Sequence, residues 1–410
     1  MSKTSPTHRP SPGRDDRITI AKALGIIMVV LAHTDGHGEL NRFIYEFHMP
    51  LFFICAGYFF SLKYLTREGE FVSRRFTGLY VPFVKWAVFF LLIHNLMFKV
   101  GILNEQYGNW TGGVTHPYTW HQMQQNLWNI VFSMGGYDEF LAGAFWFFRG
   151  LFVASILYLI LFKILVWLSD RFSRRSFAAL LGHYRLAEHT RRARGIGIAI
   201  VVLIYGMCLW KTASGLKIIT LVQGGYRDLM GCFFFGIGFL LRPVLRRLPR
   251  TPVLNIALDA VLFVVVLWFS NTLTANMNWN SSLVQCLSLP LPALCGFVLT
   301  YDIACWLERM GERNPVRRFL VYCGDHTLII FVLHICAYKI VSAFKIMYYH
   351  MDWAQMGCHM TIHDHAGEDL FWVAYTVAGV AVPLLLQYGW DRVRLGVRSW
   401  GALFLALAGC

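Results

Sequence analysis

The chain has 410 residues, of which 56% are hydrophobic, 16% aromatic and only 15% charged. Soluble globular domains carry roughly 25% charged residues. A mean hydropathy of +0.49 would leave such a domain with almost no polar surface around its core. These values exclude a single soluble domain and favour a protein whose solvent is the lipid bilayer.

Basic residues give the chain a formal net charge of +14 at pH 7. A nucleic-acid-binding protein carries such charge on one face of a folded, water-soluble module. Here Lys and Arg instead cluster in short segments between apolar runs, which is typical of the cytoplasmic loops of a membrane protein. We therefore expect membrane lipids, and no nucleic acid, among the partners.

Ten apolar runs approach the length of about 20 residues that a membrane-spanning helix needs. They predict an all-α, polytopic integral membrane protein with about ten transmembrane helices, at 18–33, 47–62, 79–98, 143–168, 195–210, 227–241, 253–270, 283–304, 319–338 and 369–390. With the N-terminus inside, most Lys and Arg of the connecting segments fall on the cytoplasmic side, so both termini are expected there. The predicted organisation is a cytoplasmic tail at 1–17, a ten-helix domain at 18–390 and a cytoplasmic tail at 391–410.

The two longest connecting segments each allow two interpretations. Segment 169–194 is rich in Arg and fits either a topology anchor against anionic lipid or a dock for an anionic cofactor such as a nucleotide. Loop 99–142 is rich in Trp, Tyr and side-chain amides, which suit either a membrane-interface belt or the stacking of sugars.

Two ionisable side chains share one face of the first predicted helix. Lys22 and His33 are eleven residues apart. At 100° per residue this is about 20° more than three full turns, with an axial separation of roughly 16 Å. Taken alone, Lys22 fits a side chain that reaches to the inner interface, and His33 fits a structural histidine. Their alignment favours a functional pair, because titratable groups inside a membrane are costly.

Three further polar residues lie within or beside the predicted spans. His48 begins the second span, where Pro50 suits the first turn of a helix and makes that turn a rigid mount. His334, in the ninth span, is about as far from its cytoplasmic end as His33 is from its own, so the two imidazoles are expected at similar depth. Arg149, near the outer end of the fourth span, needs an acidic partner, a carbonyl or a bound anion. Structural pairing and substrate contact both stay open for it.

The predicted outer loop at 350–365 contains residue types that bind zinc or copper. These are Cys358, His359, His363, Asp364 and His365. Their spacing matches no metal-binding motif, so we predict no metal site and assign the loop no role.

A set of motifs runs in order through most of the chain. It begins with DRITIAKALGIIMVVLAHT and FIYEFHMPLFFICAGYFF and continues with SRRFTGLYVPF, AFWFFRGLF, GCFFFGIGFLL and YCGDHTLIIFVLH. Together these segments closely resemble the membrane-bound acyltransferase-3 family, especially its fucose O-acetylase-like polysaccharide O-acetyltransferases. The most specific element is a basic residue and a His separated by ten residues, carried here by Lys22 and His33. Ala32 stands where the family usually has Gly, a departure that leaves the pair intact.

The resemblance implies transfer of an acyl group, usually acetyl from acetyl-CoA, to a sugar hydroxyl. The donor would be cytoplasmic acyl-CoA, and the acceptor a glycan or lipid-linked saccharide at the membrane. We accordingly expect no bound cofactor and a place in a bacterial cytoplasmic (inner) membrane.

The polar residues can be assigned to such a reaction. Neutral His33 is the predicted general base, since the pKa of an imidazole lies near the working pH. Lys22, with Arg74 and Arg75 at the inner mouth, is predicted to bind the phosphates or amide arm of the donor. The acceptor side would be lined by His48, Arg149 and His334.

Three alternatives stay open at this point. The acyl group could pass through an acyl-histidine intermediate, or the acceptor could be a peptide or a lipid. A multi-helix transporter or flippase for a glycan or anionic substrate would line a permeation path with the same residues. That third alternative predicts inverted repeats and interrupted helices, of which the sequence gives no sign.

Overall fold

The computed structural model describes residues 15–34, 36, 38–108, 113–173, 191–216, 225–247, 252–278 and 281–408. All regular secondary structure in these ranges is helical. Eight of their helices are long and apolar enough to cross a membrane. The predicted all-α, polytopic membrane fold is therefore confirmed, whereas its orientation stays a prediction.

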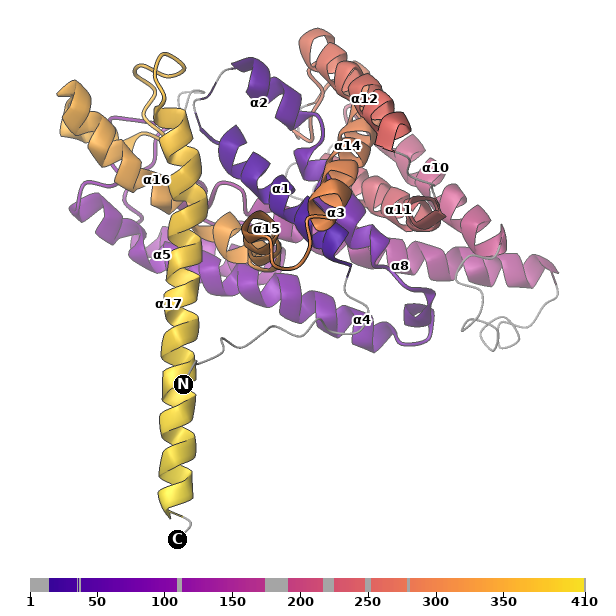
Figure 1. The fold of residues 1–410 in the computed structure, drawn as a ribbon, viewed down its shortest axis with the longest axis horizontal. Helices are drawn as coiled ribbons and strands as arrows, with labels where there is room; N and C mark the ends of the chain where they lie inside the picture. Colours follow the sequence, from indigo (N-terminus) through magenta and orange to yellow (C-terminus); the bar gives the residue numbers. More distant parts are fainter. Residues whose placement is uncertain are drawn as a thin grey trace.

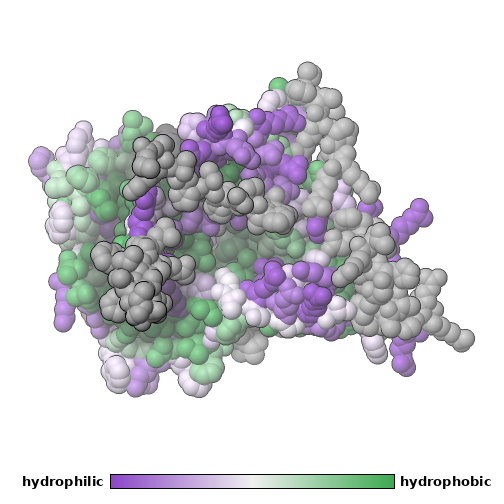
Figure 2. All heavy atoms as spheres, turned by 60° about the horizontal axis from the view of Figure 1, so that its bottom comes forward, coloured by the Kyte–Doolittle hydropathy of each residue, from purple (hydrophilic) through white to green (hydrophobic). Residues whose placement is uncertain are grey.

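The eight long helical segments correspond to eight of the ten predicted runs. They are the continuous stretch formed by α4 (Glu68–Arg75), η2 (Phe76–Tyr80) and α5 (Val81–Lys99), then α8 (Trp146–Ser173), α10 (Arg191–Ala213), α11 (Tyr226–Arg247), α12 (Pro252–Thr272), α14 (Pro290–Glu308), α16 (Thr327–Tyr349) and α17 (Phe371–Ala408). Shorter elements connect them, namely α2 (Gly38–Tyr45), η1 (Leu62–Leu65), α6 (Trp120–Ser133), α7 (Glu139–Ala142), α13 (Leu283–Ser288) and η4 (Trp353–Gly357). On the face drawn in Figure 2, hydrophobic side chains cover much of the described surface and hydrophilic ones gather in separate clusters.

The first and second predicted runs form helices that are shorter than the eight long segments. α1 (Asp16–Ala32) has 17 residues and α3 (His48–Tyr58) has 11. Both lie among the other helices (Figure 1), and most of their side chains are buried. Short helices and irregular backbone are tolerated at membrane depth where protein surrounds them. These two helices therefore form the centre of the bundle.

The ninth predicted span is interrupted where the hydropathy pattern shows no break. α15 (Pro315–Asp325) ends at Asp325, His326 caps it, and α16 begins at Thr327. Gly324 explains the close packing of α15 on α1, because a Cβ atom there would lie only 2.1 Å from the carbonyl oxygen of Thr19. The prediction of one helix over 319–338 is wrong, since tertiary packing turns the chain at a position that lacks Pro.

The last helix continues beyond its predicted end. α17 runs through Ala408, so the predicted boundary between span and tail at 390 falls inside one helix. It extends well past the other helices in Figure 1. Near its start it packs closely on α16. The absence of a side chain at Gly379 permits this, since a Cβ atom there would lie 2.6 Å from the Tyr338 ring.

Buried polar side chains hold connecting segments against the bundle. The Lys339 ammonium on α16 donates to the carbonyls of Met356 and Cys358, at 2.8 and 2.6 Å. His94 on α5 contacts the Asp138 carboxylate and donates from Nε2 to the carbonyl of His116 at 2.8 Å. These contacts fix loops that hydropathy alone describes only as connections.

Of the two long connecting segments, the structure describes most of one and little of the other. Most of the Arg-rich segment, 174–190, lies outside the described residues. In loop 99–142 the aromatic side chains of Trp120 and Trp128 on α6 are 72% and 64% exposed. Neither is among the described residues that line the two cavities presented below, so their placement fits a membrane-interface belt better than a sugar site.

Candidate active site

Two neighbouring cavities follow the length of α1. The apolar cavity, of about 270 Å³, is lined by Lys22, Ile26, Val29, Met49, Phe52, Cys55, Ala56, Phe59, Leu79, Phe147, Phe148, Leu151, Thr327, Leu328 and Phe331. The polar cavity, of about 580 Å³, is lined by Ala32, His33, Thr34, Asn41, Tyr45, His48, Met49, Tyr137, Glu139, Gly143, Ala144, Trp146, Arg227, Asn276, Met277, Asn278, His359, Met360 and Thr361. Met49 lines both cavities. The predicted pair on α1 is thus divided, with Lys22 in one cavity and His33 in the other.

His33 and His334 form a hydrogen-bonded pair of imidazoles. His33 is the residue at which α1 ends, and His334 is fully buried in α16. The Nδ1 atom of His33 lies 2.9 Å from Nε2 of His334, with the rings stacked 5.2 Å apart. The structure therefore brings together two residues that are 301 positions apart in the chain.

The surroundings of His334 define which nitrogen carries each proton. Its Nδ1 lies 2.8 Å from the carbonyl oxygen of Phe331 and 3.1 Å from that of Ile330. Carbonyl oxygens only accept, so Nδ1 carries the proton and Nε2 of the neutral ring is an acceptor. His33 then donates from Nδ1 to that acceptor, and its own Nε2 is left unprotonated. This is the tautomer that a general base requires.

His48 is held in the same tautomer by a carbonyl of the segment that precedes α3. Its Nδ1 donates to the carbonyl of Ile44 at 2.8 Å, and its ring stands edge-on to Tyr45 at 5.1 Å. The Nε2 atom of the neutral ring is consequently an acceptor in the wall of the polar cavity. The prediction that Pro50 makes a rigid mount fits this fixed backbone contact.

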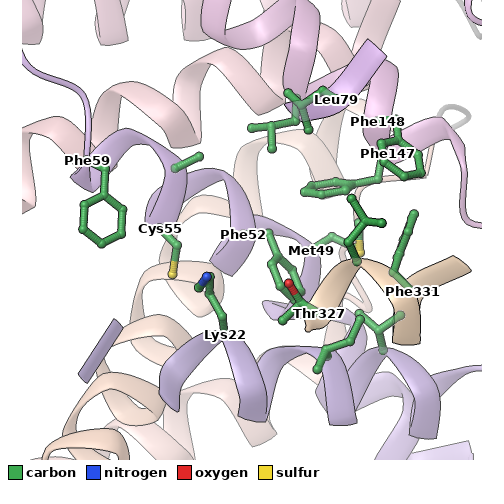
Figure 3. A pocket seen from close by; sticks show the side chains of 15 residues that line it. Lys22, Met49, Phe52, Cys55, Phe59, Leu79, Phe147, Phe148, Thr327 and Phe331 are labelled. Atoms are coloured by element: carbon green, nitrogen blue, oxygen red, sulfur yellow. The ribbon is translucent and has the colours of Figure 1, made fainter. Parts of the chain in front are cut away.

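Lys22 is the one cationic residue among the described residues that line the apolar cavity. Figure 3 shows its nitrogen near Cys55, with Phe52 between Lys22 and Met49. The other two residues predicted to bind the donor lie elsewhere. Arg74 is exposed and pairs with Glu70 at 2.7 Å. The Arg75 guanidinium lies over the ring of Phe71, 4.9 Å from its centre, and neither Arg is among the described residues that line this cavity.

Comparison with known proteins decides the family. The family model described as an acyltransferase domain, that of the acyltransferase-3 family, matches residues 15–388. The chain belongs to the acyltransferase-3 family. No curated protein and no solved structure matches this chain. The match covers both cavities of the acyltransferase and every residue assigned to its site, but it does not distinguish a subfamily.

Arg149 of this acyltransferase is used in structural pairing. Its guanidinium lies 3.3 Å from the Asp228 carboxylate on α11, and both side chains are buried. Arg149 is not among the described residues that line either cavity. Of the two roles that the sequence left open, the structure therefore supports an ion pair that joins α8 to α11.

Breaking this ion pair is expected to destabilise the acyltransferase. Arg149→Met leaves the Asp228 carboxylate buried without its guanidinium, which typically costs about 3–5 kcal/mol of unfolding free energy. The double variant R149M/D228L removes the stranded charge and should recover much of that loss. Denaturant unfolding in detergent measures both, and equal stability of the single and double variants would contradict the structural role.

Several residues of the polar cavity were not predicted from the sequence. Arg227, at the edge of a predicted apolar run, lies over the Trp146 ring at 4.1 Å and donates to the carbonyl of Met277 at 3.0 Å. Its position at the start of a span was the only available signal. The loop to which no role was assigned also contributes, through His359, Met360 and Thr361.

His359 lies in the cavity wall as a neutral imidazole. Burial, followed by the nearby Lys339 ammonium, lowers the pKa of His359 to about 4. Its ring packs edge-on against Phe140 at 4.8 Å. Within the described ranges, no group of three or more His, Cys, Asp or Glu side chains is arranged to hold a metal ion. The loop therefore contributes an uncharged polar group to the acyltransferase cavity.

Proposed function

We propose that this acyltransferase moves an acyl group, namely acetyl, from cytoplasmic acyl-CoA to a hydroxyl of a surface or lipid-linked polysaccharide. The observation that carries the proposal is the His33–His334 pair, which leaves an unprotonated Nε2 on a ring in the wall of the polar cavity. A bacterial cytoplasmic membrane, where acyl-CoA and a growing glycan meet across the bilayer, is the setting we propose.

The chemistry requires one proton acceptor and close approach of two substrates. His33 Nε2 takes the proton of the acceptor hydroxyl while the oxygen attacks the thioester carbonyl carbon. The new C–O bond forms and the C–S bond breaks. The CoA thiolate leaves and receives the proton from the His33 imidazolium. The His334 Nε2 acceptor holds His33 in the required tautomer throughout.

The apolar cavity suits the narrow acyl-carrying arm of the donor. Every residue in its lining except Lys22 and Thr327 is apolar, and such walls exclude water from a thioester. Lys22 would pair with an anionic or amide group of the donor. In this proposal Arg74 and Arg75 keep the nucleotide end at the basic face of the protein.

The polar cavity has the groups that a sugar needs. Asn41, Tyr45, Glu139 and Asn276 offer donors and acceptors, and His48 offers an unprotonated Nε2. Ligand sites fix orientation through a few such polar groups. A saccharide acceptor is therefore favoured over a purely apolar one.

Replacement of Lys22 by Gln is expected to raise the KM for acetyl-CoA by about 10-fold or more, since a charge-assisted hydrogen bond contributes roughly 1.5–3 kcal/mol. The turnover number should change less, because Lys22 is distant from His33. Steady-state kinetics on purified protein measures both. Lys99→Gln, an exposed cation at the far end of α5, is the matched control. A KM equal to that of wild type would contradict donor binding by Lys22.

Thiol release and label transfer together test the proposed function. Purified protein receives radiolabelled acetyl-CoA with and without a soluble oligosaccharide acceptor. We expect free CoA thiol and labelled glycan to form in equal amounts. A transporter would move substrate across a vesicle membrane without releasing thiol, so label that moves but stays thioester-bound would contradict the proposal.

A further inference from the structure

On three helices the lining changes from one cavity to the other within a few residues. On α1, Val29 lines the apolar cavity and Ala32 the polar one, a separation of about 4.5 Å along the axis. On α8, Trp146 lines the polar cavity and the next residue, Phe147, the apolar one. On α3 the change occurs at Met49, which lines both.

We infer that the Met49 side chain forms the throat between the cavities and limits the size of the acyl group that reaches His33. Met49 is thus a specificity-determining residue for the acyl donor. This inference rests on the proposed function, since it assumes that a thioester enters through the apolar cavity.

The backbone of Met49 is fixed while its side chain is adaptable. It lies in the first turn of α3, between His48, whose ring is bonded to the Ile44 carbonyl, and Pro50. The side chain is 8% exposed. A thioether on three rotatable bonds fills irregular gaps and can be displaced. Met49 can therefore yield to a small group without movement of the helix.

Aromatic rings next to the throat form a more rigid wall. Phe331 packs against Phe147 at 5.8 Å and against Phe148 at 5.3 Å, and Phe52 packs against Phe147 at 5.7 Å. Figure 3 shows Met49 beside Phe331 and the two α8 rings. Interlocked rings resist displacement, because each is held by its neighbours. The opening therefore depends mainly on Met49.

The order of atoms in the donor explains the effect on specificity. The sulfur remains on the side of the apolar cavity, so the acyl group precedes it past Met49 towards His33. Acetyl extends one methyl group beyond the carbonyl, and butyryl adds two methylenes. One methylene in a tight apolar site changes specificity by about 10–200-fold. A throat closed by Met49 thus favours acetyl over longer groups.

The test compares acetyl-CoA, butyryl-CoA and hexanoyl-CoA as donors. Met49→Ala should raise the butyryl-to-acetyl ratio of kcat/KM by about 10-fold or more, and Met49→Phe should lower it. Met356→Ala is the matched control, because Met356 is equally buried but lines neither cavity among the described residues. Its ratio should equal that of wild type. If M49A does not insert, Met49→Val replaces it.

The outcomes separate this inference from the proposed function. If wild-type protein transfers acetyl but the ratio is unchanged in M49A (or M49V) and in M49F, the throat is overturned while the acyltransferase proposal stands. If wild-type protein shows no His33-dependent acyl transfer from any donor, the proposed function itself fails. A ratio that rises equally in M356A would also overturn the inference.

Discussion

Replacement of His33 by Ala is expected to abolish measurable acyl transfer while the protein stays folded in the membrane. The variant loses the imidazole whose Nδ1 is bonded to His334 and whose Nε2 is free to accept a proton. General-base catalysis contributes typically about 10²–10⁴-fold to rate. The fold should persist, because His33 lies at the end of α1 and not in its packed interior.

Release of CoA thiol by purified H33A, compared with wild type, measures this effect. His116→Ala is a suitable control, because the His116 side chain is 64% exposed and its ring pairs with Glu105. Wild-type rates in H33A would remove the residue from the chemistry. Label retained on wild-type protein without acceptor, and lost in H33A, would instead indicate the acyl-histidine route.

Replacement of His334 by Ala should lower the turnover number by about 10²-fold, the lower end of a general-base contribution, with little change in the KM for acetyl-CoA. His334 does not line either cavity among the described residues, so it acts by holding His33 in position. Without it, the His33 proton can move to Nε2, and the ring loses its orientation. Gln at this position should recover part of the rate, since its carbonyl oxygen can accept from Nδ1.

A control on the same helix separates positioning from packing. Tyr338→Phe removes the hydroxyl that donates to the Val30 carbonyl at 2.6 Å, next to His334, but leaves the imidazole pair intact. Its turnover number should stay near that of wild type. Equal losses in H334A, H334Q and Y338F would show that only packing matters and would contradict the positioning role.

Hydropathy predicted the helices because membrane insertion depends on the property that hydropathy measures. It failed where the environment is protein and not lipid. α1 and α3 are short helices with mostly buried side chains, and the break at His326 lies beside the close approach of Gly324 to Thr19. The pattern of a single sequence does not contain these tertiary contacts.

The candidate site could be predicted from the sequence only in part, for the same reason. Helical periodicity placed Lys22 and His33 on one face, and counting residues placed His334 at the depth of His33, where the structure has their rings in contact. Periodicity could not show that Arg149 faces Asp228, or that the 350–365 loop folds back over the polar cavity. Those arrangements depend on which helices become neighbours.

The most direct test of the account is transfer of radiolabel from acetyl-CoA to an oligosaccharide by purified protein in lipid vesicles, with wild type and H33A assayed together. We expect labelled glycan, with one CoA thiol released per label, from wild type and none above background from H33A. Equal labelling by both proteins, or thiol release by neither, would contradict it.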